Sequence, residues 1–377
     1  FGQTLGSLFK NPQVRDTEEV QAVSQFQSFC TALAATLGTG NITGVATAIV
    51  SGGPGAVFWM WISAVLGMMT NYAENYLGIT YRYKDEKGQW VGGAMVYIEK
   101  GLGCKWLAVV FSFCCIGASF GMGNMVQGNS MANGLKNVFQ IPVFFTAIVS
   151  AVVVAYVLNG GMKRIAVCTE KLVPLMAGIY LITACGILIV CRQRVGWAFL
   201  EIIKNAFTPR AACAGVGGYQ LKTVIQTGIS RGVFSNEAGL GSSVIAHVQS
   251  DVKKPEIQGM WGIAEIFVDT ILVCTVTALV LLVSGVYRPE ICIQNFSTGI
   301  ENIDGTTLMA RAFGSVIPFG EELLVLSTVL FALATMIGWS CLGERTAVYL
   351  GKEKGTKAIR FAARQLGYAP DLCLSHE

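Results

Sequence analysis

The sequence predicts an all-α protein that crosses a membrane several times, and three observations support this fold class. Of 377 residues, 53% are hydrophobic and only 13% are charged, whereas a soluble domain usually carries about 25% charged residues. Runs of about 20 apolar residues, the length that a spanning helix requires, recur along the whole chain. Two of these runs are interrupted by glycine and polar residues, which points to broken helices inside the membrane.

Eight membrane spans are predicted in chain order. Their approximate bounds are 24–50, 55–80, 106–133, 141–159, 172–191, 222–248, 259–287 and 321–343. The turn between the first two spans is marked by the glycines and the proline of residues 52–55. Between the fifth and sixth spans, residues 195–207 form an amphipathic stretch that we expect to lie along the membrane surface.

The distribution of Lys and Arg predicts the orientation in a cell membrane. If residues 1–23 are a cytoplasmic segment, the positive residues of the inner segments outnumber those of the outer segments by more than two to one, as the positive-inside rule requires. The two broken spans then run in opposite directions, which predicts an inverted repeat. The first repeat would cover 24–191, an incomplete second repeat 222–350, and 351–377 would be a polar tail. We expect helices to be missing at both ends of the repeated unit.

The first break contains Gly38, Thr39, Gly40 and Asn41. Glycine lets the chain leave the helical conformation without a steric penalty. The freed carbonyl groups can bind a hard cation, while freed amides at a half-helix N-terminus attract a carboxylate. A pair of glycines that only allows close helix packing is the alternative interpretation. Broken helices in corresponding positions of two halves indicate the binding site of a secondary transporter.

The second break follows Phe234 and Ser235 and contains Glu237. An ionisable residue at membrane depth is rare and usually functional. Glu237 could bind a coupling ion, act as a gate, or simply stabilise the following half-helix. Arg231 is a candidate ion-pair partner, and the Phe234 ring would form one wall of a small pocket.

Further candidates lie in the third and eighth spans. The Gln127 amide could bind a zwitterion or join two helices. Thr335 and Trp339 are four residues apart and so share a helix face; the hydroxyl could bind sodium and the indole could cover a pocket, or the indole could pack in the bundle core. For Glu74, Glu265 and Asp269, a structural polar network is the favoured interpretation.

Several classes of function are disfavoured. The small net charge of +4 suggests no nucleic-acid partner. Only two histidines occur and no two of the 12 cysteines have C-x-x-C spacing, so a metal centre of Cys and His is not expected. No nucleophile–base pair or phosphate-binding loop is recognisable, and hence no enzyme is predicted.

At the two breaks, the sequence resembles the alanine or glycine:cation symporter family, also called sodium:alanine symporters. The resemblance covers nearly all of residues 25–350. It is carried by the stretches Gly38-Thr39-Gly40-Asn41-Ile42-Thr43-Gly44 and Phe234-Ser235-Asn236-Glu237-Ala238-Gly239-Leu240-Gly241, with supporting stretches at 52–61, 92–103 and 338–345.

The resemblance implies a leucine-transporter-type fold and transport of a small neutral amino acid with sodium, with no organic cofactor. It implies a sodium site formed by the backbone oxygens of Ala34 and Leu37 and by the Thr335 hydroxyl. It also implies an amino-acid site that comprises Gly38, Gly40, Asn41, Gln127, Phe234, Ser235 and Trp339. We therefore predict a symporter for alanine or glycine that works by alternating access. The rival prediction is a truncated member that binds substrate or occupies the membrane without transporting.

Overall fold

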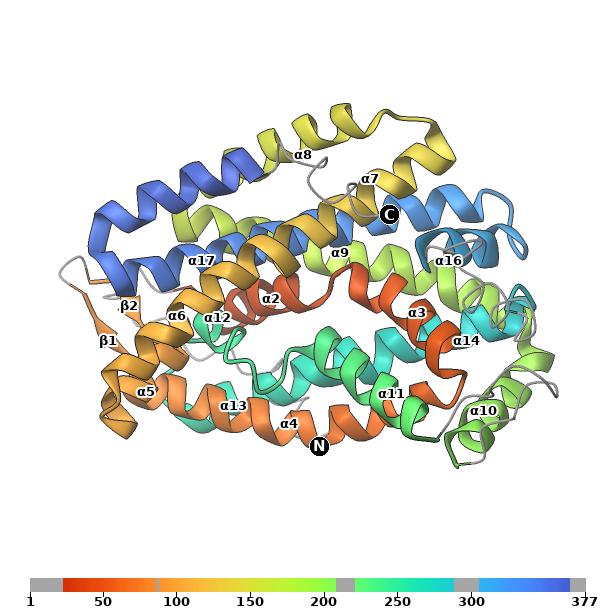
Figure 1. Ribbon diagram of the computed structural model, residues 1–377, viewed down its shortest axis with the longest axis horizontal. Coiled ribbons are helices and arrows are strands. Elements are labelled where there is room, and N and C mark those ends of the chain that lie inside the picture. The colour runs from red at the N-terminus through yellow and green to blue at the C-terminus, as the bar shows by residue number, and fades with distance from the viewer. Residues whose placement is uncertain (1–22, 86–87, 208–220, 288–304, 367–377) are drawn as a thin grey trace.

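The computed structural model describes residues 23–85, 88–207, 221–287 and 305–366. Within these ranges nearly all of the regular structure is helical (Figure 1). The single sheet of the described residues is a short antiparallel hairpin of β1 (Tyr83–Lys84) and β2 (Trp90–Val91).

The first predicted span is broken, as the sequence indicates. It consists of α2 (Gln25–Thr36), a short 3₁₀ turn η1 (Thr39–Asn41) and α3 (Thr43–Gly52). Helix α2 begins with a capping box, in which the Ser24 hydroxyl accepts from the Gln27 amide and the Gln27 side chain accepts from the Ser24 amide. The break itself therefore lies between two regular helical halves.

The sixth predicted span is broken as well. It consists of α11 (Leu221–Asn236) and the single turn α12 (Val244–His247), joined by a non-helical segment. Within that segment Glu237, Gly239 and Gly241 have positive φ values of 56°, 88° and 69°. This left-handed backbone ends α11 abruptly, since residues in that conformation cannot continue a right-handed helix.

The remaining helices surround these two. They are α4 (Ala56–Tyr81), α5 (Ala94–Leu102), α6 (Lys105–Phe120), α7 (Val126–Phe139), α8 (Val143–Leu158), α9 (Gly161–Val190), α10 (Arg192–Phe207), α13 (Pro255–Ile266), α14 (Thr275–Ser284), α16 (Gly305–Gly314) and α17 (Gly320–Leu366). Two π-helical turns, η2 (Gly121–Met125) and η3 (Phe267–Cys274), join α6 to α7 and α13 to α14. Such turns frequently occur at functional sites.

Two predicted boundaries differ from the observed helices. Helix α9 begins at Gly161 rather than near residue 172, so the positively charged residues Lys163 and Arg164 lie on the helix. Helix α17 continues to Leu366 beyond the predicted end at 343, so part of the predicted polar tail is helical. Neither extension is predicted, because both contain many polar residues and hydropathy identifies only the apolar part of a helix.

Five described helices are long and apolar enough to cross a membrane by length and composition. These are 56–81, 105–139, 161–190, 255–284 and 320–351. The apolar helices α3 and α8 are shorter, and both broken spans are divided into short halves. The prediction of eight spans therefore remains a prediction.

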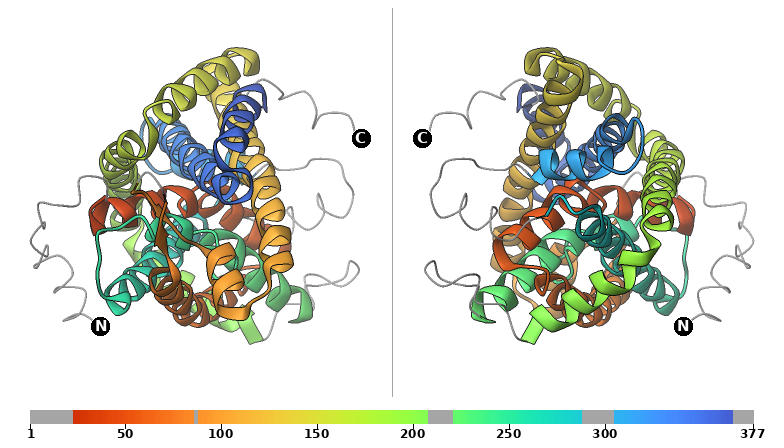
Figure 2. Two further views of the ribbon diagram at one scale, coloured as in Figure 1. Left: turned by 90° about the vertical axis from the view of Figure 1, so that its left-hand side faces the viewer. Right: turned by 90° about the vertical axis from the view of Figure 1, so that its right-hand side faces the viewer.

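The two broken spans run antiparallel through the middle of the bundle. Helix α2 contacts α12, whereas α3 contacts α11, so the first half of each span lies beside the second half of the other. Figures 1 and 2 show them between α17 on one side and α4 with α13 on the other. This arrangement places both breaks at the same level of the bundle.

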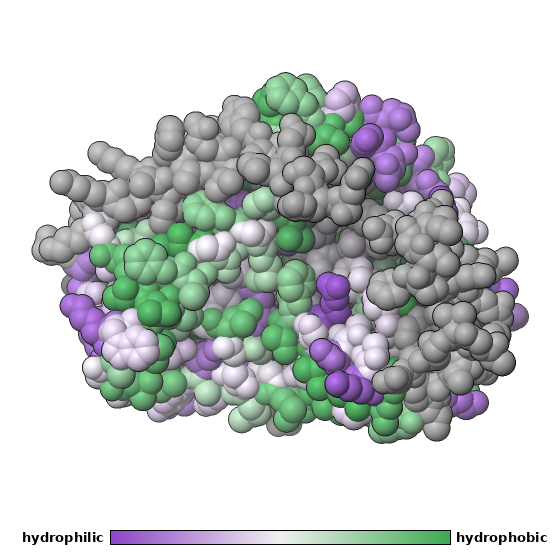
Figure 3. Space-filling view, viewed as in Figure 1, coloured by the Kyte–Doolittle hydropathy of each residue, from purple (hydrophilic) through white to green (hydrophobic). Residues whose placement is uncertain are grey.

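Large apolar side chains cover much of the outer surface. Leu66 is 69% exposed, Phe113 65% and Ile182 76%, and Figure 3 shows broad hydrophobic areas on one face. Extensive exposed apolar surface on long helices is what a lipid-facing protein requires. Many polar side chains, among them Asn41, Gln127 and Asp269, are buried inside the bundle.

Candidate functional site

The first break is stabilised by hydrogen bonds from its own and neighbouring side chains. The Gly38 amide donates to Asn41 Oδ1 at 3.0 Å. The Thr39 amide and hydroxyl both donate to Gln127 Oε1, at 3.0 and 2.9 Å. These bonds satisfy backbone groups that the broken helix leaves free inside an apolar bundle. The predicted site residues Gly38, Asn41 and Gln127 thus lie together.

Gly38 lies where no side chain fits. A methyl group added at this position would lie 2.8 Å from Thr335 Oγ1 and 3.1 Å from Gln127 Oε1. At Gly40 an added methyl would lie 3.4 Å from the Phe234 ring. The break therefore lies close to α17 and α7 on one side and to the Phe234 ring of α11 on another.

The three residues of the predicted sodium site meet where α2 ends beside α17. The Thr335 hydroxyl donates to the Leu37 carbonyl oxygen at 3.2 Å, and both residues are buried. Ala34 is buried one turn earlier, where its backbone lies against Gly338. Carbonyl and hydroxyl oxygens are suitable ligands for a hard cation. Their assignment to sodium remains a prediction.

Glu237 joins the second break to α17. Its carboxylate accepts from Trp339 Nε1 at 3.0 Å and from the Ser242 hydroxyl at 2.6 Å, and the side chain is buried. The Trp339 side chain also lies against Gly123 of η2, where an added methyl would be 2.3 Å from Trp339 Cβ. Among the described contacts, Trp339 is thus a partner of Glu237 and a part of the core.

The candidate ion pair between Arg231 and Glu237 is not formed in the described part of the chain. Helix α11 continues through Asn236, so the break begins too late to bring Arg231 back to the Glu237 carboxylate. Both carboxylate oxygens of Glu237 are already hydrogen-bonded, to Trp339 and Ser242. Arg231 is half-buried on α11, and its role in gating or coupling remains a prediction.

A polar cluster centred on Asp269 links the two breaks. Asn41 Nδ2 donates to Asp269 Oδ1 at 2.6 Å and to Ser235 Oγ at 3.0 Å. The Ser235 and Thr270 hydroxyls donate to Asp269 Oδ2 at 2.8 and 2.7 Å. The sequence favours a structural polar network as the role of Asp269. Its position inside the π-helical turn η3 is what directs it toward both breaks.

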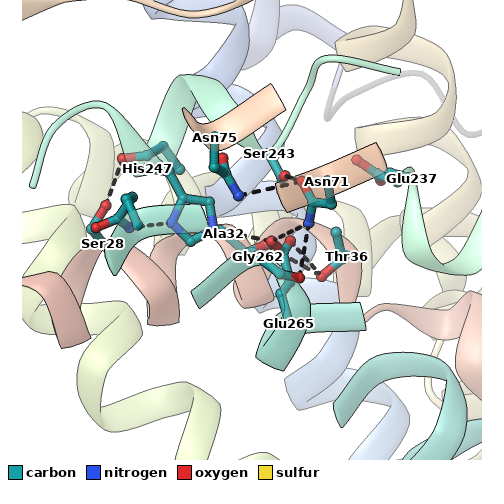
Figure 4. Close-up of polar contacts among 12 residues, drawn as sticks. Ser28, Ala32, Thr36, Asn71, Asn75, Glu237, Ser243, His247, Gly262 and Glu265 are labelled. Carbon is teal, nitrogen blue, oxygen red and sulfur yellow. Dashed lines mark hydrogen bonds and ion pairs between the residues drawn. The ribbon is translucent and has the colours of Figure 1, made fainter. Parts of the chain in front are cut away.

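A second buried cluster includes His247 and Glu265 (Figure 4). Glu265 Oε2 lies 3.0 Å from His247 Nε2 and accepts from Asn71 Nδ2 at 3.0 Å. Thr36 at the end of α2 donates to Glu265 Oε1 at 3.5 Å. This cluster joins α2, α4, α12 and α13, and it agrees with the structural interpretation made for Glu265.

Glu74 is a third buried carboxylate, on α4. It accepts from the Gly241 amide at 3.1 Å and so holds the segment between α11 and α12. The candidate residues thus form one polar centre around the two breaks. The His247–Glu265 cluster supports this centre by joining α2 and α12 to α4 and α13.

The amino-acid sequence of this chain is similar to those of known membrane transporters. A sequence model described as the sodium:alanine symporter family matches residues 1–366. A transporter of Haemophilus influenzae is 42% identical over 364 residues, which is 96% of this chain and 76% of that protein. The sodium/alanine symporter AgcS of Methanococcus maripaludis is 42% identical over 347 residues, which is 90% of this chain and 73% of that protein.

Solved structures share the fold at low sequence identity. MhsT in complex with L-phenylalanine has a TM-score of 0.60 at 13% identity, covering 92% of this chain and 79% of that one. A Na⁺-coupled sialic acid symporter has a TM-score of 0.60 at 12% identity, covering 98% of this chain and 78% of that one. A manganese transporter of Eremococcus coleocola has the same TM-score at 15% identity, covering 96% and 72%.

Proposed function

The chain belongs to the sodium:alanine symporter family, and from that premise we propose that it couples sodium entry to the uptake of a small neutral amino acid, alanine or glycine. At the coarser level it is a multi-pass membrane transporter that couples amino-acid movement to sodium, and it is not an enzyme. The finer assignment, including alternating access and a cytoplasmic N-terminus, is the proposal.

The observation that carries the proposal is the meeting of the two breaks. Asn41 of the first break and Ser235 at the end of α11 are hydrogen-bonded to each other and to Asp269. Backbone and side-chain groups at such breaks can bind both ends of a zwitterion, because half-helix ends carry opposite partial charges. We propose that Gly38, Gly40, Asn41, Gln127, Phe234, Ser235 and Trp339 form the amino-acid site.

Space around the first break supports a small substrate. A methyl group added at Gly38 would lie 2.8 Å from Thr335 Oγ1 and 3.1 Å from Gln127 Oε1, and the Phe234 ring lies beside Gly40. We propose that the Phe234 ring beside Gly40 limits the substrate to a short side chain. Because the 34% identical GlnT of Bacillus subtilis is described as a probable sodium/glutamine symporter, competition by glutamine is the informative comparison.

The proposed sodium site provides the coupling. Ala34, Leu37 and Thr335 link the first break to α17, so a bound ion would stabilise the arrangement that holds substrate. One charge that crosses 100 mV supplies about 2.3 kcal/mol. This energy sustains a substrate gradient of about fiftyfold, since about 1.4 kcal/mol corresponds to tenfold.

Uptake of labelled alanine into proteoliposomes tests the proposal. We expect accumulation with an inward sodium gradient, stimulation by an inside-negative potential, and no accumulation when choline replaces sodium. Excess glycine should compete, and excess glutamine should compete weakly. Sodium-independent flux that follows the alanine gradient would contradict coupling. Sodium-dependent alanine binding without uptake would instead favour the rival prediction of a chain that binds but does not transport.

A further inference from the structure

Glu237 is a large side chain at a backbone position that favours glycine. Its φ value is 56°, in the left-handed region, and it directly follows the last residue of α11. The other two left-handed residues of the same segment are Gly239 and Gly241. A residue with a Cβ atom is strained in this conformation, whereas glycine is not, and such strain is concentrated at functional sites. The side chain of Glu237 therefore has a role that offsets the strain.

The Glu237 carboxylate holds the polar edge of the Trp339 indole. Its Oε1 accepts from Trp339 Nε1 at 3.0 Å, and its Oε2 accepts from the Ser242 hydroxyl at 2.6 Å. Both carboxylate oxygens are thus used, and Glu237 is only 4% exposed. The N–H group is the single hydrogen-bond donor of an indole. This one bond therefore determines the direction in which the polar edge of the ring points.

The other end of the Trp339 side chain is held by the π-helical turn η2. A methyl group added at Gly123 would lie 2.3 Å from Trp339 Cβ and 2.5 Å from Trp339 Cγ, so α17 lies against the η2 backbone with no side chain between them. Trp339 is 2% exposed. The indole is consequently fixed at both ends, by η2 at Cβ and by Glu237 at Nε1.

This fixed ring lies close to the first break. Trp339 follows Thr335 by four residues on α17, so the two side chains lie on the same face about one turn apart. Thr335 Oγ1 is the atom nearest to a methyl group added at Gly38, at 2.8 Å. An apolar pocket distinguishes substrates that differ by one methylene by about 10–200-fold. Discrimination of this kind requires walls that do not yield to the larger substrate.

We propose that Glu237 is a positioning residue that orients the Trp339 indole and thereby sets the size limit of the amino-acid site. The inference rests on the proposed function, because it assumes that Trp339 borders the bound amino acid. It adds that the second break supplies the carboxylate that holds a wall of the pocket beside the first break. Glu237 acts through the indole and does not itself contact the substrate.

The test is competition between amino acids in proteoliposomes that contain the full chain. Sodium-driven uptake of labelled alanine is measured against unlabelled alanine or valine, and the selectivity ratio is the half-inhibitory concentration of valine divided by that of alanine. Glu237→Gly removes the carboxylate and suits the left-handed backbone; we expect it to lower the ratio about tenfold or more. Gln140→Gly, the matched control, changes another left-handed residue, at the exposed end of α7, and should leave the ratio unchanged.

Trp339→Phe tests whether the indole transmits the effect. This variant keeps an aromatic ring but has no N–H group to donate, so it should also lower the selectivity ratio. Adding Glu237→Gly to Trp339→Phe should have no further effect, because no hydrogen bond is left to lose. Glu237→Gln keeps an acceptor for the indole and should preserve the ratio. Multiplied losses in the double variant, or a lowered ratio in Glu237→Gln, would overturn the positioning role.

The remaining outcomes separate the inference from the proposed function. If the unsubstituted chain shows no sodium-driven alanine uptake, the proposed function fails and the inference fails with it. Normal uptake by that chain with an unchanged ratio in Glu237→Gly would overturn the inference alone. If Glu237→Gly does not fold, Glu237→Asp replaces it, because Asp tolerates left-handed backbone but is one methylene too short to reach the indole. An unchanged ratio in Glu237→Asp would equally overturn the inference.

Discussion

At the residue scale, the absence of a side chain at Gly38 is a steric requirement. The position has little room because Thr335 and Gln127 approach it from two helices. Six residues further along the same broken span, Gly44 has no heavy atom within 4 Å of an added methyl group. The two glycines look equivalent in the sequence but have different surroundings in the structure.

This difference predicts unequal effects of adding one methyl group. Gly38→Ala should reduce alanine uptake about tenfold or more, because overpacking typically costs about 1–3 kcal/mol and about 1.4 kcal/mol is a factor of ten. Gly44→Ala, the control, should transport at close to the original rate. The measurement is initial uptake at saturating sodium. Equal losses in the two variants would show that backbone freedom, not contact with Thr335, matters at Gly38.

Thr335 offers a second residue-scale prediction. Thr335→Ala removes the hydroxyl that reaches Leu37 and should raise the sodium concentration for half-maximal uptake about tenfold, since losing one buried polar partner costs about 1–3 kcal/mol. Thr328→Ala on the same helix is the control, because its hydroxyl donates only within α17, to Leu324. A similar sodium dependence in both variants would argue against the proposed sodium site.

At the scale of the elements, the His247–Glu265 cluster joins the half-helices α2 and α12 to α13 and α4. Glu265 of α13 contacts Thr36 of α2 and His247 of α12, and Asn71 of α4 bonds both Glu265 and Ser243. Short helical pieces such as the four-residue α12 have little stability of their own. The hydrogen bonds of the cluster therefore hold α12 in place, because its intrinsic helix propensity is not enough to do so.

A double-mutant cycle tests this positioning role. His247→Ala should lower the thermal unfolding midpoint, because it leaves a buried carboxylate with fewer partners at a cost of about 1–3 kcal/mol. Adding Glu265→Gln should recover part of that loss, since a buried amide is less costly than a buried charge. Ser28→Ala, which removes one hydrogen bond to the Ala246 carbonyl, is the control. Strictly additive effects of the two substitutions would show that the residues are not coupled.

At the scale of the whole molecule, the antiparallel broken spans set the symmetry of the fold. Contacts of α2 with α12 and of α3 with α11 place the first half of each broken span beside the second half of the other. The orientation in the membrane follows from the charges of the connecting segments rather than from this symmetry. We therefore predict a cytoplasmic N-terminus on the basis of Lys and Arg alone.

Reporter fusions check the predicted orientation. A fluorescent protein fused before residue 1 should fluoresce, because it folds in the cytoplasm. Alkaline phosphatase fused after Phe207, at the end of α10, should be active because this end is predicted to face outward. The reverse pattern of the two reporters would invert the topology while leaving the fold unchanged.

Much of the fold and part of the site are predictable from local sequence. The breaks at 38–41 and 237–243 are visible because glycine and polar residues interrupt apolar runs, and helices in hydrocarbon tolerate such interruptions only where other groups satisfy the backbone. The family is recognisable from these same stretches. The resemblance also predicts Gly38, Asn41 and Gln127 as site residues, and the structure places these three together.

Only the tertiary structure decided which distant groups meet. Asp269 contacts both breaks, Glu237 bonds to Trp339 and not to Arg231, and Glu265 pairs with His247. Sequence periodicity shows which face of a helix is polar, but not which partner that face will meet. Hydrogen bonds between residues far apart in the chain depend on the packing of helices and on π-helical turns. Local sequence therefore determined the class of protein and the place of the breaks, and packing determined the network around them.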